Sequence, residues 1–134
     1  MRFLFLFLIF IFSSAIAEEN INVALDKCRA KTVTDEAYLC ISDKKEQLKQ
    51  EYEIEFKKLL MKVKKEKKYV MNFNDLNSSL LNSKKSWDKW VKLECLTEAN
   101  TNEKDTKYYY SVYDTCLVEH YTQRIDHYHK FNFM

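Results

Sequence analysis

The sequence of 134 residues contains no glycine and no proline. Glycine is the usual residue of tight β-hairpin turns and of loops that hold nucleotide phosphates, because it adopts positive φ angles at little cost. Without glycine, β-rich folds and phosphate-binding loops are disfavoured. Helices joined by polar loops are the class that remains.

The sequence also lacks a strong excess of charge of either sign, with 22 lysines and arginines against 20 acidic residues. Loss of the N-terminal segment described next removes one basic residue, Arg2, so the mature chain is one charge less basic than the +2 of the whole sequence. Proteins that bind nucleic acid generally carry a clear basic excess. The charge balance therefore argues against a nucleic-acid partner.

Residues 1–17 have the features of a secretory signal peptide. Arg2 precedes an apolar run over residues 3–12 that is too short to span a bilayer permanently, and Ala15-Ile16-Ala17 matches a cleavage signature. An uncleaved N-terminal anchor is the alternative. We predict cleavage after Ala17 and a single mature domain, residues 18–134, that is periplasmic or secreted.

The mature part contains all four cysteines of the chain: Cys28, Cys40, Cys95 and Cys116. An even number of cysteines in a short exported chain predicts two disulfides, because export delivers the chain to an oxidising compartment. The alternative is a zinc site, but structural zinc ligands usually come in closely spaced pairs, and these cysteines lie far apart. We therefore expect disulfides and no metal or other cofactor.

The positions of the cysteines favour local pairing. Cys28 and Cys40 lie at similar distances either side of a predicted turn, and Cys95 and Cys116 are nearly symmetric about a predicted polar loop. We favour the pairs 28–40 and 95–116, and the sequence leaves the other two connectivities open.

Apolar residues recur at helical spacing in four stretches, about 20–31, 35–70, 78–99 and 105–130. Thr34, followed by two acidic residues, is a favourable N-cap for the second helix, and Asn77 or Ser78 can cap the third. The predicted fold class is all-α: a small antiparallel helical bundle of three main helices and a short N-terminal helix, cross-linked by two disulfides.

Two of these helices have clear apolar faces. The face of the second helix comprises Ile41, Leu48, Tyr52, Phe56, Leu59 and Val63. The face of the last helix comprises Tyr109, Val112, Tyr113, Cys116, Leu117, His120, Arg124 and Tyr128. We expect both faces to line the core.

The third helix carries both tryptophans, Trp87 and Trp90, and we expect them to anchor the core. Arg124 lies on the apolar face of the last helix, where an unpaired guanidinium would be costly. We therefore expect a pair with Glu94 or Asp88 at the bundle edge. The alternative is that Arg124 anchors an anionic partner.

The sequence contains no convincing catalytic or metal site. His120, His127 and His129 lack the spacing and the acidic neighbours of a metal site. Ser83 and Ser86 have no recognisable base nearby, and a disulfide-bonded sulfur is not a nucleophile. We expect a binding protein and not an enzyme.

Two surface features remain. Residues 57–68 contain seven lysines against one acidic residue, Glu66, which indicates either a solvated helix face or a surface for anionic lipid or glycan. Tyr108-Tyr109-Tyr110 must expose at least one ring, because three successive residues cover most of the circumference of a helix. Exposed tyrosines are common at interfaces.

The order of these features resembles the LprI-like lysozyme inhibitor family, a group of small exported bacterial domains. The resemblance rests on Cys28, Cys40, Tyr52 and Leu59, then Ser83-Lys84-Lys85-Ser86-Trp87-x-x-Trp90-x4-Cys95, then Cys116-Leu117-Val118-Glu119 and Arg124-Ile125. The chain departs from the usual family pattern where Lys84 replaces glutamine, Trp90 replaces tyrosine and Val91-Lys92 replace arginine-aspartate.

The resemblance implies a protein that binds and blocks a lysozyme or another cell-wall-associated protein. Lysozymes have an acidic cleft, so Lys84, Lys85 and Lys89 are candidates to enter it, with Tyr108 as a further contact. The alternative function is a structural or host-interaction protein that binds membrane or cell-wall polyanions through its lysine-rich helix face.

Overall fold

The structure is a computed structural model that describes residues 12–32 and 34–132. Its elements are α1 (Phe12–Arg29), α2 (Thr34–Lys65), the 3₁₀ helix η1 (Lys67–Tyr69), α3 (Phe73–Ala99) and α4 (Lys107–Lys130). The described ranges contain helices and no strand. The predicted all-α class is therefore confirmed.

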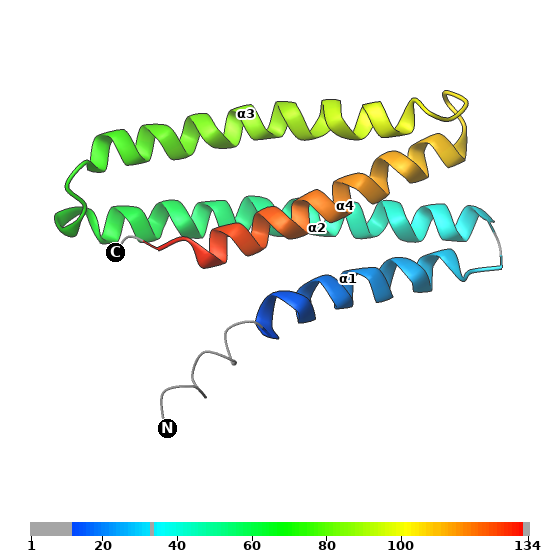
Figure 1. Cartoon of the computed structure of the whole chain (residues 1–134), viewed down its shortest axis with the longest axis horizontal. Coiled ribbons are helices and arrows are strands. Elements are labelled where there is room, and N and C mark those ends of the chain that lie inside the picture. Colours follow the sequence, from blue (N-terminus) through cyan, green and yellow to red (C-terminus); the bar gives the residue numbers. More distant parts are fainter. Residues whose placement is uncertain (1–11, 33, 133–134) are drawn as a thin grey trace, which may run out of the picture.

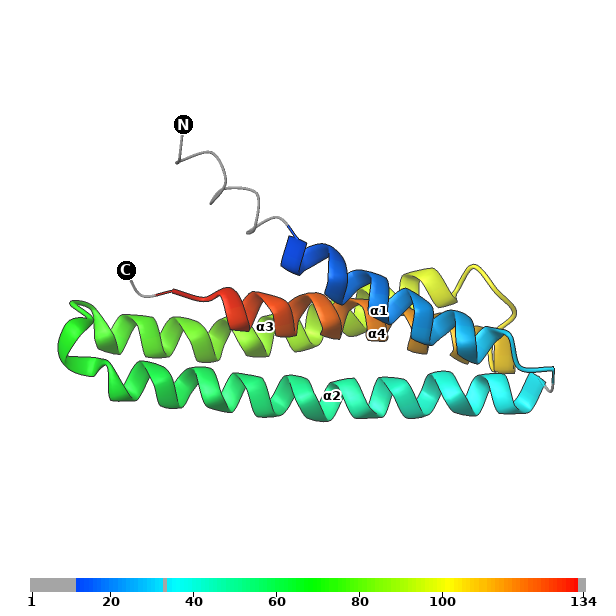
Figure 2. The ribbon, with the colours of Figure 1, turned by 90° about the horizontal axis from the view of Figure 1, so that it is seen from below.

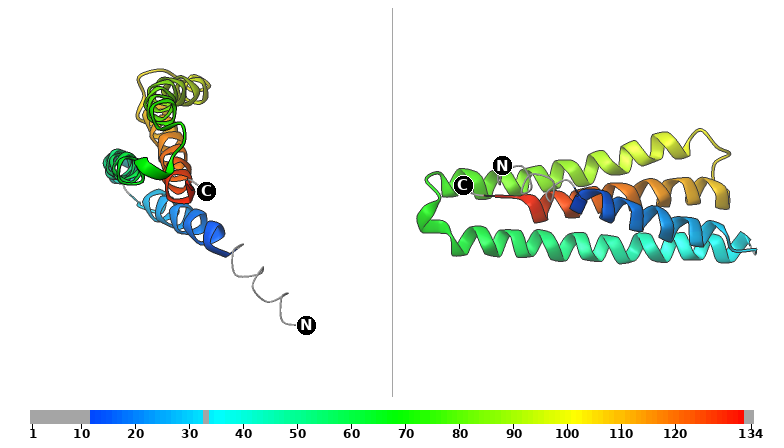
Figure 3. Two further views of the ribbon diagram at one scale, coloured as in Figure 1. Left: turned by 90° about the vertical axis from the view of Figure 1, so that its left-hand side faces the viewer. Right: turned by 60° about the horizontal axis from the view of Figure 1, so that its bottom comes forward.

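Helices α2, α3 and α4 form an elongated antiparallel bundle, and α1 runs back along the start of α2 (Figure 1). Helix α4 packs most extensively on α2 and next on α3, while α2 and α3 touch each other little. Figure 3 shows α4 between them in its right-hand view. The N-terminal turns of α1 diverge from the bundle (Figure 2).

The core-facing side of α2 is the one expected. Its buried residues are the six predicted from helical spacing, from Ile41 to Val63. Helix α4 differs, because it also buries Val118, Tyr121 and Ile125, which lie outside the predicted face. Helix α4 packs extensively on both α2 and α3, and this explains its wider burial.

The boundaries of α2 and α3 differ from the predicted ones. Helix α2 ends at Lys65 and not near residue 70, and η1 follows it. Helix α3 begins at Phe73 after the N-cap residue Asn72, so the expected caps Asn77 and Ser78 lie inside the helix. Phe73 and Leu76 pack against the core, which provides a reason for this earlier start.

The expected signal peptide lies mostly outside the described residues, which begin at Phe12. Helix α1 is longer than predicted at its N-terminal end and runs through the position of the expected cut after Ala17. Within the described ranges, no helix combines the length and apolar character needed to cross a bilayer.

Both favoured disulfide pairs are confirmed. Cys28 in α1 bonds to Cys40 in α2 with a Cα–Cα distance of 5.4 Å, and Cys95 in α3 bonds to Cys116 in α4 with a Cα–Cα distance of 5.5 Å. These distances are usual for disulfides. One bridge therefore attaches the N-terminal helix, and the other joins the last two helices.

Candidate functional site

A polar cluster joins α2 to α3 beside the core. The Tyr52 hydroxyl donates a 2.6 Å hydrogen bond to Oδ1 of Asp88, and Lys84 Nζ lies 2.8 Å from Oδ2 of Asp88 and 2.9 Å from Oε1 of Glu53. Lys84 Nζ also lies 4.8 Å from the centre of the Tyr52 ring. The cluster thus fixes one lysine with two carboxylates and a phenol.

Lys84 was expected to contact a partner, and in the structure its ammonium group is held by residues of the chain itself. Its side chain is only 15% exposed. Burial would lower the pKa of Lys84, but the hydrogen bonds to Asp88 and Glu53 outweigh that effect and raise the pKa. Lys84 is therefore a charged structural residue that faces the core.

Trp87 is partly buried and packs against tyrosines of the core. Its ring centre lies 5.0 Å from that of Tyr52 and 5.8 Å from that of Tyr121. Trp90 was expected beside it in the core, and this expectation is wrong. Trp90 is 46% exposed, and the ring of His120 meets it edge-on at 5.2 Å.

Arg124 does not pair with Asp88 or Glu94 as expected. Among the described residues it has no carboxylate partner; Nη2 donates to Oγ of Ser83 at 3.1 Å, and Nε donates to the Tyr128 hydroxyl at 3.4 Å. Lys84 and Tyr52 each contact one oxygen of Asp88, so that carboxylate already has a cation and a phenol beside it.

The side of α3 that faces away from the core carries exposed lysines and apolar residues. Leu93 is 55% exposed and Leu96 37%. We call this surface the α3 outer face, and its members are Lys85, Lys89, Trp90, Lys92, Leu93 and Leu96. Positions 85, 89, 92 and 96 recur at helical spacing, which places them in one row.

The three lysines of the α3 outer face are exposed and form no ion pair within the part of the chain that the structure describes. Lys85 and Lys89 were expected from the sequence, whereas Lys92, Leu93 and Leu96 were missed. The signal for them was available, because Val91 and Cys95 mark the buried side of the same helix. The face offers positive charge beside apolar surface.

The other surface candidates lie apart from the α3 outer face in the chain. All seven lysines of residues 57–68 are exposed at the end of α2 and in η1. Tyr108 is 60% exposed at the start of α4, and Tyr110 is 51% exposed, while Tyr109 between them is buried. At least one exposed tyrosine ring was expected here, and two are present.

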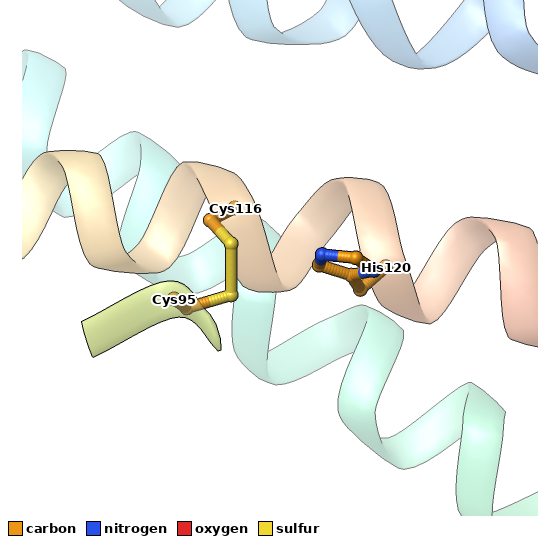
Figure 4. Close-up of side chains that lie close together, drawn as sticks. All are labelled: Cys95, Cys116 and His120. Atoms are coloured by element: carbon orange, nitrogen blue, oxygen red, sulfur yellow. A yellow bond between two sulfur atoms is a disulfide. The ribbon is translucent and has the colours of Figure 1, made fainter. Parts of the chain in front are cut away.

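Three potential metal ligands meet near the second disulfide. Ligand atoms of Cys95, Cys116 and His120 lie within 4.8 Å of one another (Figure 4). The sulfurs of both cysteines are bonded to each other, and a disulfide sulfur is not the thiolate that binds zinc. This grouping was not predicted from the sequence, although Cys116 and His120 are one helical turn apart.

The last two histidines are engaged elsewhere. Nε2 of His129 lies 2.9 Å from Oε2 of Glu55, and the ring of His127 lies against those of Tyr128 and Phe131. The pKa of Glu55 is lowered, chiefly by a hydrogen bond from Lys58 and further by the contact with His129. These contacts give His127 and His129 a structural role at the surface.

Comparison with known families supplies one match. The family described as Lysozyme inhibitor LprI matches residues 26–127, which include both disulfides, the polar cluster and the α3 outer face. No curated protein and no solved structure matches the chain significantly.

Proposed function

Because the chain belongs to the LprI lysozyme inhibitor family, we propose that it is an exported bacterial protein that binds a lysozyme and blocks its substrate cleft. The family match covers residues 26–127, most of the chain. Two disulfides and the signal-peptide features of residues 1–17 support a periplasmic or secreted location.

The α3 outer face is the observation that carries the proposed binding mode. Glycoside hydrolases of the lysozyme type use a pair of carboxylates that flank the scissile bond. Lys85, Lys89 and Lys92 present positive charge that has no acidic partner among the described residues and complements such a cleft, and Trp90 and Leu93 add apolar contact area beside them.

Packing and a disulfide hold α3 in place behind the α3 outer face, and a rigid surface of this kind can block a cleft without reacting. Trp87 packs on the opposite side of α3, and the Cys95–Cys116 disulfide fixes the C-terminal part of the same helix to α4. A face held in this way loses little conformational entropy when it binds. The inhibitor then acts by covering the cleft, and no residue of its own reacts.

The proposal is tested by a cell-wall lysis assay with lysozymes of several types. We expect the oxidised protein to inhibit at least one type, and protein whose disulfides have been reduced and alkylated to inhibit much less. Absence of inhibition by the oxidised protein across all lysozyme types would reject the proposal.

A second candidate function rests on the lysine run at the end of α2. All seven lysines are exposed, and Tyr69 and Met71 just beyond them are 70% and 98% exposed. Basic residues beside exposed aromatic and apolar ones suit a surface of anionic lipid or cell-wall polymer. Binding of this kind weakens steeply between low and moderate salt, whereas an interface with aromatic anchors persists.

A further inference from the structure

A cavity of about 190 Å³ opens between α2, α3 and α4. It lies near the C-terminal end of α4, because Arg124, His127 and Tyr128 are among its lining residues. Its apolar wall consists of Phe56, Leu59, Leu76, Leu80 and Phe131. Most of the lining is therefore hydrocarbon, as in small-molecule binding sites.

Five residues with polar groups complete the lining: Ser79, Ser83, Arg124, His127 and Tyr128. No acidic residue is among the described residues that line the cavity. The cavity thus combines an apolar wall with a guanidinium, an imidazole and three hydroxyl groups. This composition favours a negatively charged occupant over a neutral or cationic one.

Arg124 is held in place without being neutralised. Its guanidinium donates to the Ser83 and Tyr128 hydroxyls, and its Cζ atom lies 5.4 Å from the ring centre of Trp87 and 5.2 Å from that of Tyr128. Hydroxyl and ring contacts orient the group but leave its full charge. A guanidinium also has more N–H donors than these two hydroxyl oxygens use.

The geometry of the cavity narrows the chemistry of the occupant. An arginine fork binds a carboxylate through two parallel hydrogen bonds. A hydrated inorganic anion would gain nothing from the apolar wall, whereas a carboxylate on an apolar stem would bury that stem. The volume is below that of usual drug-sized pockets, which excludes a long acyl chain and leaves a stem of a few carbons or one ring.

We propose that this cavity binds a small organic monocarboxylate, with the carboxylate on Arg124 and its short apolar or aromatic stem against Phe56, Leu59 and Leu80. The site is separate from the α3 outer face. Ser79, Leu80 and Ser83 face the cavity, whereas Lys85, Lys89 and Lys92 lie on the other side of the same helix. The proposal therefore does not rest on lysozyme binding.

Calorimetric titration of the oxidised full-length mature protein with phenylacetate tests the proposal. Phenylacetamide is the matched neutral ligand, because it has the same ring and nearly the same shape without the charge. We expect saturable binding of the acid and binding of the amide that is at least roughly tenfold weaker. Equal binding of acid and amide, or no saturable binding of the acid, overturns the proposal.

Inorganic sulfate tests the role of the apolar wall. We expect sulfate to compete with phenylacetate only at concentrations roughly tenfold or more above the phenylacetate dissociation constant. Equal affinity for sulfate would mean that the stem is not recognised and would overturn that part of the proposal.

Fluorescence tests whether the carboxylate binds at Arg124. In a Trp90→Phe background, Trp87 is the only tryptophan, and its ring lies beside Arg124. We expect phenylacetate to change the emission of Trp87 with the same saturation as in calorimetry. In the same background, Arg124→Gln should weaken binding by roughly ten- to a hundredfold, the loss of charge-assisted hydrogen bonds. Lys85→Gln, which removes an exposed charge from the other side of α3, should leave binding unchanged.

Arg124 also contacts structural residues, so the thermal midpoint of each variant is measured alongside. If Arg124→Gln does not fold, Ser83→Ala takes its place, and we expect a weakening of a few-fold because the guanidinium loses one orienting contact. Undiminished binding in a folded Arg124→Gln protein, or equal loss in Lys85→Gln, places the carboxylate elsewhere and overturns the assignment.

Discussion

The hydroxyl of Tyr52 in α2 donates a 2.6 Å hydrogen bond to the carboxylate of Asp88 in α3, 36 positions away in the sequence. Lys84 Nζ lies 2.8 Å from the other oxygen of the same carboxylate. Since α2 and α3 otherwise touch each other little, this polar cluster is a main direct link between them. It also keeps Lys84 on the core side of α3, away from the α3 outer face.

Replacement of Tyr52 by Phe should destabilise the protein by about 2 kcal/mol, because the hydrogen bond joins a buried phenol to a charged group. The matched control is Tyr110→Phe, whose hydroxyl donates to Asp105 at 3.0 Å at the surface. We expect the control to change stability by less than about 0.5 kcal/mol. Urea unfolding measures both, and equal effects would contradict the structural role of the Tyr52–Asp88 bond.

Lysines 84 and 85 are neighbours in sequence with opposite roles. Lys84→Met should destabilise by about 2 kcal/mol, because Asp88 and Glu53 lose their cation. Lys85→Met should change stability by less than about 0.5 kcal/mol, since Lys85 is exposed and unpaired within the described residues. Thermal unfolding separates the two variants. A similar loss in both would show that Lys84 is not the buried partner of Asp88.

The buried tyrosines predict loss of stability at alkaline pH. Burial raises the pKa of Tyr121 to about 12, from an ordinary value of 10.0, and burial also raises that of Tyr52. A phenol whose pKa is higher in the folded state stabilises the fold fully below the ordinary pKa, and this contribution is lost as pH rises from about 10 through the folded-state value. The raised pKa of Lys84 acts in the same direction.

Phenolate absorbance followed with circular dichroism measures this effect. We expect Tyr52 and Tyr121 to titrate only above pH 10, together with unfolding. Tyr121→Phe should make the stability less dependent on pH between about 10 and 12. Titration of every tyrosine near pH 10 with the helices intact would contradict the burial of Tyr52 and Tyr121.

The two disulfides should differ in what their removal releases. Each closes a loop, with sequence separations of 12 and 21, and loss of either should cost about 3 kcal/mol. Replacing Cys28 and Cys40 by Ser should free α1 in particular, because Leu25 is its one other fully buried residue among those with described side chains. Replacing Cys95 and Cys116 should loosen α3 against α4.

Hydrogen exchange distinguishes these outcomes. We expect the amides of α1 to lose protection in the Cys28→Ser/Cys40→Ser protein while those of α2 and α4 keep most of theirs. Uniform loss of protection along the whole chain in that protein would contradict the local role of the first disulfide.

The sequence predicted the fold where one side of a helix meets the core. The buried residues of α2 followed directly from helical spacing, because that helix packs mainly on one neighbour, α4. Helix α4 packs extensively on both α2 and α3, so one apolar face did not describe it, and Val118, Tyr121 and Ile125 were missed. Spacing along a chain does not reveal how many neighbours a helix has.

The candidate site was predictable in part, and the predictions for Arg124 and Trp90 were wrong for separate reasons. Both Lys84 and Arg124 were suitable cations for Asp88. Arg124 was predicted as its partner, whereas Lys84 forms the ion pair in the structure. The local signal was the four-residue spacing of Lys84 and Asp88, which favours a pair on one helix. Trp90 was placed in the core for its size, yet Trp87 and Val91 already occupy the core-facing side of α3.

Occlusion of a lysozyme through α3 is tested most directly by charge reversal on the α3 outer face. Lys89→Glu is compared with Lys64→Glu, which reverses an exposed lysine on α2, in lysis assays with a lysozyme that the unaltered protein inhibits. We predict that Lys89→Glu raises the inhibition constant roughly tenfold or more while Lys64→Glu leaves it unchanged. Full inhibition by Lys89→Glu, or equal loss in Lys64→Glu, would contradict binding through this face.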